Sequence, residues 1–201
     1  MAKTVLVTGA SGFVAAHVLH DFLGAGYNVR AAVRSESTAD KVRKTHGKYG
    51  DALSFVIVPD IAAPGAFDEA VKGVDGVSFY LNQFSTRLTG AKVIHTASPF
   101  VLNADDFDKD LFQPALNGTL GVLKAVKAFA PEVKRVVITS SFAAVIDYEK
   151  GNRPGHTYTE ADWNTLSPET TKKNKDPVAA YLVSKAIAER AAYDFVEKEK
   201  V

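Results

Sequence analysis

The chain contains no cysteine among its 201 residues. Disulfide bonds, thiolate metal ligands and cysteine nucleophiles are therefore excluded, and the composition fits a reducing compartment. No apolar run approaches the roughly 20 residues that a membrane-spanning helix requires. The N-terminal segment enters an apolar stretch within four residues, which is not the architecture of a signal peptide. We therefore expect a cytoplasmic protein with no membrane association.

Neither sign of charge dominates, because 24 Lys and Arg residues are matched by 23 Asp and Glu residues. This balance gives no field that would attract nucleic acid or an anionic membrane, so we expect neither as a partner. The basic run at 172–175 is expected to be a solvated loop. With 46% hydrophobic and 23% charged residues, the composition is that of a globular protein, and 201 residues suffice for a single domain with a sizeable core.

Short apolar runs rich in β-branched residues alternate with segments of helical periodicity. Strands are predicted at 4–8, 28–33, 53–58, 93–96 and 135–140. Helices are predicted at 12–23, 38–46, 66–72, 107–129 and from Pro177 to near the end, with Asp176 as the N-cap of the last one. This alternation predicts an α/β fold, a Rossmann-like doubly wound parallel sheet with helices on both faces.

A glycine pattern, Gly9-x-x-Gly12-x-x-Ala15, follows the first strand and opens the first helix. Gly9 permits a tight turn, Gly12 lets the backbone approach a pyrophosphate, and Ala15 lets the helix pack on the sheet. Free backbone N–H groups and the positive end of the helix would face the phosphates. The pattern predicts dinucleotide binding, and the alternative is a structural glycine turn. The predicted binding residues are Gly9, Ser11, Gly12, Phe13 and Val14.

The end of the second strand is where such folds distinguish the two nicotinamide cofactors. Arg34 stands there, and its guanidinium matches the oxygens of a 2′-phosphate. Glu36 is the competing acidic residue, but it lies past the strand end. We therefore favour NADP(H) over NAD(H), the alternative being that Arg34 is a surface charge. Asp60 and Ile61, just past the third strand, are expected at the adenine edge.

Tyr181 and Lys185 lie four residues apart on the last predicted helix and therefore share one face. A phenol has a pKa near 10, and a nearby ammonium favours the phenolate and lowers that pKa. Ser141, just past the fifth strand, can hydrogen-bond a substrate carbonyl oxygen. The three residues predict hydride chemistry with a nicotinamide cofactor. The alternative is a core tyrosine and a solvated lysine.

Six segments carry a resemblance to a known family: VTGASGFVAAHV near the N-terminus, HTASPF at 95–100, PALNGT at 114–119, VVITSSFAAV at 136–145, EADWN at 160–164 and AYLVSKAIAE at 180–189. Together they resemble the extended short-chain dehydrogenases/reductases, which form the NAD-dependent epimerase/dehydratase family. The similarity is greatest to fungal NADPH-dependent ketone, aldehyde and methylglyoxal reductases and to the related dihydroflavonol and cinnamoyl-CoA reductases. The segments span nearly the whole chain in family order.

The resemblance implies a role for each residue of the predicted trio. Ser141, rather than Ser140, would be the catalytic serine, because the family uses the second Ser of its Thr-Ser-Ser. Tyr181 would donate the proton, and Lys185 would also hold the nicotinamide ribose. The resemblance further implies a cofactor-lining segment at Thr96, Ala97 and Ser98.

Some positions invite a second interpretation in the light of the family. His95 could act as a lone catalytic base, but the resemblance makes it a packing residue at a strand end. Thr38 occupies a place where a Lys that touches the 2′-phosphate is expected. That difference weakens the preference for NADP(H) without reversing it.

Residues 77–92 form an anomalous insertion between a glycine turn and the fourth strand, where connections usually take a few residues. Residues 77–81 could themselves form a strand. Relatives pass almost directly from the turn into the strand, so 77–90 is either a genuine surface loop or a retained intron. Val77-Ser78 can be encoded as GTGAGT, a splice-donor sequence.

The chain stops at Val201, soon after the Tyr-Lys helix, whereas the family continues into a substrate-binding lobe. We therefore expect a truncated NAD(P)-binding domain, 1–201, without that lobe, with an exposed sheet surface that promotes self-association. The leading interpretation is NADPH-dependent reduction of a ketone or aldehyde to an alcohol. The alternatives are a sugar-nucleotide epimerase or dehydratase and a non-catalytic, truncated pseudoenzyme that binds NADP(H).

Overall fold

A computed structural model describes residues 2–74, 93–96 and 104–200. The chain divides into two compact units, Met1–Ala97 with Gly121–Thr139 and Ser98–Leu120 with Ser140–Val201. The insertion at 77–92, with its alternative strand at 77–81, lies outside the described residues. The predicted cofactor residues Ala97 and Ser98 also lie outside them.

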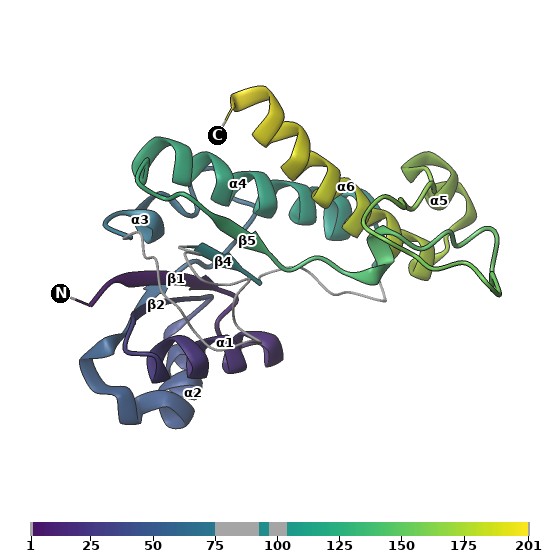
Figure 1. Cartoon of the computed structure of the whole chain (residues 1–201). Helices are drawn as coiled ribbons and strands as arrows, with labels where there is room; N and C mark the ends of the chain where they lie inside the picture. The colour runs from purple at the N-terminus through teal and green to yellow at the C-terminus, as the bar shows by residue number, and fades with distance from the viewer. Residues whose placement is uncertain (1, 75–92, 97–103, 201) are drawn as a thin grey trace. The chain divides into compact units, whose positions relative to one another are not determined.

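The first unit is built on a parallel sheet of five strands (Figure 1). They are β1 (Thr4–Thr8), β2 (Asn28–Val33), β3 (Leu53–Ile57), β4 (Val93–His95) and β5 (Val136–Ile138). Their order is β3-β2-β1-β4-β5, and every paired strand is parallel to its neighbour. The predicted parallel sheet is confirmed, with β3, β4 and β5 shorter than the sequence predicts.

Helices cover both faces of this sheet within the first unit (Figure 1). One face carries α1 (Phe13–Gly24) and α2 (Glu36–His46), followed by the 3-10 helix η1 (Gly47–Ala52). The other face carries the short α3 (Asp68–Val71) and residues 121–129 of α4 (Gln113–Phe129). Phe67 links these elements, because its ring makes a T-shaped contact with the His95 ring and lies beside Gly121. The predicted doubly wound arrangement is thereby confirmed.

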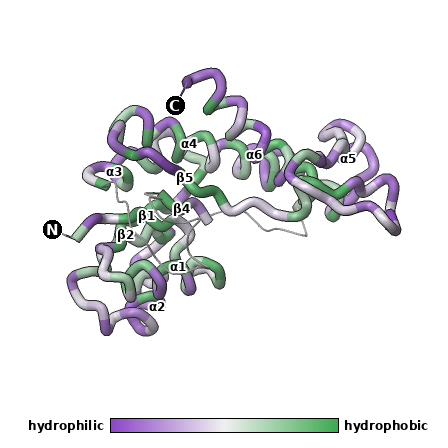
Figure 2. Tube along the Cα trace, in the orientation of Figure 1, coloured by the Kyte–Doolittle hydropathy of each residue, from purple (hydrophilic) through white to green (hydrophobic). Residues whose placement is uncertain are grey.

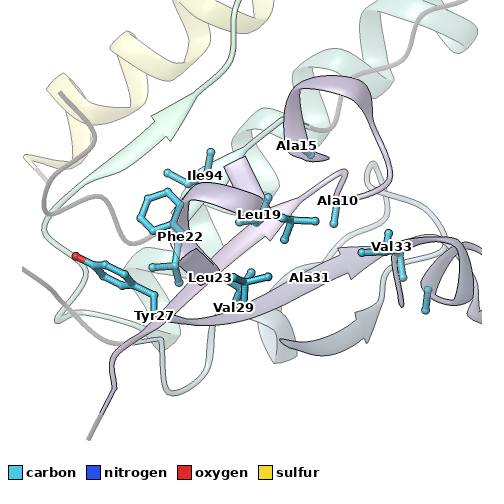
Figure 3. Close-up of a cluster of buried hydrophobic side chains, with 14 residues drawn as sticks. Ala10, Ala15, Leu19, Phe22, Leu23, Tyr27, Val29, Ala31, Val33 and Ile94 are labelled. Atoms are coloured by element: carbon cyan, nitrogen blue, oxygen red, sulfur yellow. The ribbon is translucent and has the colours of Figure 1, made fainter. Parts of the chain in front are cut away.

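The core of the first unit lies between the sheet and α1 and α2 (Figure 3). Leu19, Phe22 and Leu23 of α1 pack on Val29 and other strand residues. On β1, all of Val5, Leu6 and Val7 are at most 1% exposed. A strand buried on both faces requires such a continuous apolar run, which explains why TVLVT does not alternate.

The second unit is mostly helical. It contains the π-helical turn η2 (Asp108–Phe112), the first part of α4, the 3-10 helix η3 (Phe142–Ala144), α5 (Pro168–Asn174) and α6 (Pro177–Glu199). Leu111, Phe112, Ala180 and Val183 form its small core. Hydrophilic residues dominate the C-terminal end of α6 (Figure 2). No helix in the described ranges combines the length and apolarity needed to cross a membrane.

The start of α6 agrees with the sequence, whereas the basic run before it does not. The Asp176 carboxylate accepts hydrogen bonds from the N–H groups of Val178 and Ala179 at 2.9 and 3.1 Å, as the predicted N-cap requires. The run 172–175, predicted to be a loop, is instead the last turn of α5 and its left-handed cap. The prediction was wrong because Ser167 caps a helix that carries almost no apolar periodicity.

Candidate functional site

The glycine turn at the end of β1 has the geometry that the sequence predicts. Gly9 has a φ of 61°, in the left-handed region that favours glycine. The Gly12 N–H donates to the Gly9 carbonyl oxygen at 2.9 Å, and a Cβ on Gly12 would lie only 3.2 Å from that oxygen. A side chain at either position would therefore disturb the turn.

Directly after the turn, α1 begins at an exposed and uncapped N-terminus. Its N-cap is Gly12, which has no side chain to accept from the N–H groups of the first turn, and that turn contains no acidic residue. Those N–H groups have no partner within the helix, and the positive end of the helix dipole lies there. Phe13 is 85% exposed, and Ser11 and Val14 are also exposed. This end of α1 can bind an anion such as a phosphate.

A polar network holds the ends of β1 and β4 beside the turn. Thr8 Oγ1 shares a hydrogen bond of 2.9 Å with His95 Nδ1 and accepts from the Thr96 N–H at 3.2 Å. In return, Thr96 Oγ1 donates to the Thr8 carbonyl oxygen at 2.5 Å. His95 is only 3% exposed, as expected for a packing residue at a strand end. The hydroxyl of Thr96, a predicted cofactor residue, fixes the strand ends.

Arg34 follows β2 immediately and its side chain is exposed. It makes no ion pair with another described residue. The competing Glu36 carboxylate lies 3.7 Å from Nη1 of Arg43, so it forms an ion pair within α2. Ser35 caps α2, because its hydroxyl accepts from the Thr38 N–H at 3.3 Å and is hydrogen-bonded to the Thr38 hydroxyl. Of these groups, the Arg34 guanidinium is the one available to a phosphate.

Asp60 and Ile61 lie in the loop after β3. The Asp60 carboxylate accepts a hydrogen bond from the Ala62 N–H at 2.8 Å. Aspartate residues in loops commonly form such a bond to the backbone two residues on. Ile61 is half-buried, and its carbonyl oxygen lies near Gly121. These contacts give the loop a fixed conformation.

The second unit contains Ser141, Tyr181 and Lys185. Ser141 is the N-cap of η3, where its hydroxyl accepts from the Ala143 N–H at 3.2 Å. Tyr181 and Lys185 lie one turn apart on α6, and α6 packs against η3. Lys185 Nζ is 5.4 Å from the centroid of the Tyr181 ring. The structure therefore brings the tyrosine and the lysine together, on a helix in contact with the segment that the serine caps.

The electrostatics of this trio centre on Lys185, which is 9% exposed. Burial lowers the pKa of the Lys185 ammonium, because the charged form loses water. The ammonium lies beside the ring of the Tyr181 phenol. This pairing can support proton transfer by Tyr181. No cluster of three or more metal-ligating side chains occurs among the described residues.

Sequence reasoning assigned no role to two residues that contact the serine segment. Ser140 Oγ donates to the Glu189 carboxylate, and the buried Asn164 donates to the Ala143 carbonyl oxygen at 3.2 Å. One signal was available for Glu189: it lies four residues after Lys185, on the same face of the predicted helix. Asn164 ends the EADWN segment, but nothing in that segment identifies its partner.

Comparison with known protein families supplies an independent finding. The family model described as "NAD dependent epimerase/dehydratase family" matches residues 5–201. The match therefore includes the glycine turn, Ser141 and the Tyr-Lys helix.

Individual relatives are similar over almost the whole chain. A ketoreductase of Aspergillus niger, azaE, is 38% identical over 203 residues, which cover 100% of this chain and 54% of the relative. The crystal structure of yeast methylglyoxal/isovaleraldehyde reductase Gre2 complexed with NADPH is 37% identical, with a TM-score of 0.83 and coverage of 98% of this chain and 54% of that one. Gre2 from Candida albicans in complex with NADPH is 36% identical, with a TM-score of 0.81 and coverage of 97% and 53%. The chain thus spans about half the length of these relatives.

Proposed function

The chain belongs to the NAD dependent epimerase/dehydratase family, and from this we propose that it serves NADPH-dependent reduction of a ketone or aldehyde to an alcohol. The names of its relatives support the proposal, since they include a ketoreductase and a methylglyoxal/isovaleraldehyde reductase complexed with NADPH. The observation that carries it is the pairing on α6 of a buried Lys185 with Tyr181, 5.4 Å from ring centroid to Nζ.

Each residue of the trio has a distinct role in the proposed reaction. Tyr181 donates the proton that the carbonyl oxygen gains, while the Lys185 ammonium stabilises the resulting phenolate and binds the nicotinamide ribose. Ser141 donates a hydrogen bond to the same carbonyl oxygen and orients it. NADPH, when bound, supplies the hydride that the carbonyl carbon receives. One hydride and one proton convert the carbonyl to the alcohol.

The cofactor would be held by backbone and side chains of several loops. The pyrophosphate is assigned to the glycine turn and the start of α1, and the 2′-phosphate to Arg34, which supports NADP(H) over NAD(H). The remaining proposed contacts are Asp60 and Ile61 at the adenine and Thr96, Ala97 and Ser98 along the cofactor. In this proposal, 1–201 acts as one nucleotide-binding domain in the cytoplasm, and its partner is a small carbonyl compound.

Calorimetric titration of the 201-residue chain with NADPH and with NADH tests the cofactor assignment. We expect preferential binding of NADPH, and we expect Arg34→Ala to weaken it about tenfold or more, because bonds to a charged phosphate are lost. Lys44→Ala removes another exposed cation from α2 and serves as the control. Equal affinity for both cofactors, or an equal effect of the two substitutions, would contradict the role of Arg34.

NADPH oxidation with a panel of aldehydes and ketones tests the chemistry. Tyr181→Phe removes the donated proton and is expected to lower kcat about 100- to 10,000-fold, with NADPH affinity unchanged. Tyr193→Phe is the matched control, because Tyr193 is a 61% exposed tyrosine on the same helix. Conversion of a sugar nucleotide without net cofactor turnover would favour the epimerase alternative. Binding of NADPH without oxidation by any carbonyl would favour the non-catalytic module.

A further inference from the structure

We propose that Glu189 is a positioning residue for Ser141: its carboxylate holds the hydroxyl of the adjacent Ser140 and so fixes the serine segment against α6. This inference rests on the proposed carbonyl reduction, because it concerns the serine that would orient the substrate. All of the residues involved belong to the second unit.

The helical spacing places Glu189 on the face of α6 that carries the other two proposed catalytic residues. Tyr181, Lys185 and Glu189 follow one another at intervals of four residues in an unbroken helix. Residues four apart are neighbours on one face, separated by roughly 6 Å along the axis. The carboxylate that binds Ser140 therefore lies one turn beyond Lys185, and one helix holds both the proton-transfer pair and the anchor of the serine segment.

The two adjacent hydroxyls differ in how their protons are used. A serine hydroxyl has a single proton to donate, and the Ser140 proton is donated to the Glu189 carboxylate, a strong charged acceptor. Ser141 Oγ accepts from the Ala143 N–H, which uses an oxygen lone pair and leaves its own proton for a substrate carbonyl. Glu189 thereby gives a physical reason why Ser141, rather than Ser140, contacts the substrate.

The segment on the other side of Ser141 has its own anchor. Asn164 is 3% exposed. Its backbone N–H donates to the Ala144 carbonyl oxygen at 2.8 Å, and its side-chain amide donates to the Ala143 carbonyl oxygen at 3.2 Å. Arg190, the residue after Glu189, donates to the Asn164 carbonyl oxygen at 3.4 Å. Adjacent residues of α6 therefore reach both flanks of Ser141, Glu189 directly and Arg190 through Asn164.

Loss of Asn164 and loss of Glu189 should have different effects, the first on global stability and the second on the segment around Ser141. Asn164 is buried and bonded to the backbone, so its removal would leave unsatisfied groups and destabilise the unit. Ser140 is exposed and Glu189 is half-buried. An exposed bond contributes little to global stability, so its loss should chiefly loosen the segment around Ser141.

The test is a set of kinetic measurements on the 201-residue chain. Glu189→Ala is expected to lower kcat about 10- to 100-fold by misplacing Ser141, with NADPH affinity unchanged. Glu189→Gln retains an oxygen acceptor for Ser140 and is expected to restore most of that loss. Glu197→Gln, on an exposed acid of the same helix, is the control and leaves kcat unchanged.

Double variants separate positioning from a general structural role. Because Glu189 acts through Ser140, adding Ser140→Ala to Glu189→Ala should cause no further loss. In a Ser141→Ala background, Glu189→Ala should change kcat by less than about twofold, since the group that it positions is gone. An equal loss from Glu189→Ala with and without Ser141, or full activity in Glu189→Ala, overturns the proposal.

Amide hydrogen exchange tests the same proposal without relying on turnover. Ala144, Val145 and Ile146 donate their N–H groups within the turn that Ser141 opens. Glu189→Ala should accelerate exchange at these amides and leave β2 unaffected, whereas Glu197→Gln should alter neither. If the unsubstituted chain reduces no carbonyl, the proposed function fails, and the exchange rates still decide whether Glu189 fixes the segment. Unchanged exchange in Glu189→Ala overturns the inference.

Discussion

At the scale of single residues, Lys185 is subject to two opposing effects. Burial disfavours its charge and lowers its pKa, while its proposed role next to Tyr181 requires that charge. A lysine with a lowered pKa in the folded state binds fewer protons there than in the unfolded state. Stability therefore rises with pH through the window between the lowered folded pKa and the usual value of 10.5.

Lys185→Met tests this conflict. The variant should lose carbonyl reduction by about 100-fold or more, yet be no less stable than the original chain near neutral pH, because a buried charge has been removed. As pH rises toward about 10, the original chain should gain stability relative to the variant. Urea unfolding at several pH values measures the difference, with Lys198→Met at the exposed end of α6 as the control. Parallel stability profiles for the original chain and Lys185→Met would contradict the burial effect.

At the scale of elements, local signals predicted the sheet, and distant contacts could not be predicted. Glycines and β-branched runs determine where β1 and β2 begin and end, because those signals act within a few residues. Ser167 and Pro168 mark the start of α5, but the segment lacks apolar periodicity, and the run 172–175 at its end is therefore wrongly predicted as a loop. The bond between Ser140 and Glu189 joins residues 49 positions apart, and the sequence supplies only the helical spacing of one partner.

The turn between β1 and α1 gives a prediction at this scale. Gly12→Ala would place a Cβ 3.2 Å from the Gly9 carbonyl oxygen and shift the backbone that faces the proposed pyrophosphate. We expect NADPH affinity to fall about tenfold, measured by calorimetry. Gly47→Ala is the matched control, since a Cβ there meets nothing within 4 Å and its φ of −62° suits alanine. Equal effects of the two substitutions would show that the turn is not specifically required.

At the scale of the whole molecule, the outer strands of the described sheet are a predicted site of association. β3 and β5 are the outer strands of the described sheet, and Ile57 on β3 is 37% exposed. Unpaired edges with apolar side chains promote association with other chains. The relatives are about twice as long as this chain.

We therefore expect the 201-residue chain to self-associate as its concentration rises. Sedimentation velocity across a concentration series measures this association. Ile57→Lys places a charge on the outer strand and should shift the distribution toward the monomer. Lys44→Ala, away from the strand, should have no such effect. A single monomeric species at every concentration would contradict the expectation.

The bonds among Thr8, His95 and Thr96 join the ends of two strands that are far apart in the sequence. They secure the register of the three-residue β4 against β1 at its C-terminal end, where Thr8 is paired with His95. Because so short a strand offers few backbone hydrogen bonds, these side-chain bonds add to the pairing that holds it beside β1. Thr96 therefore keeps its place beside the glycine turn that follows β1.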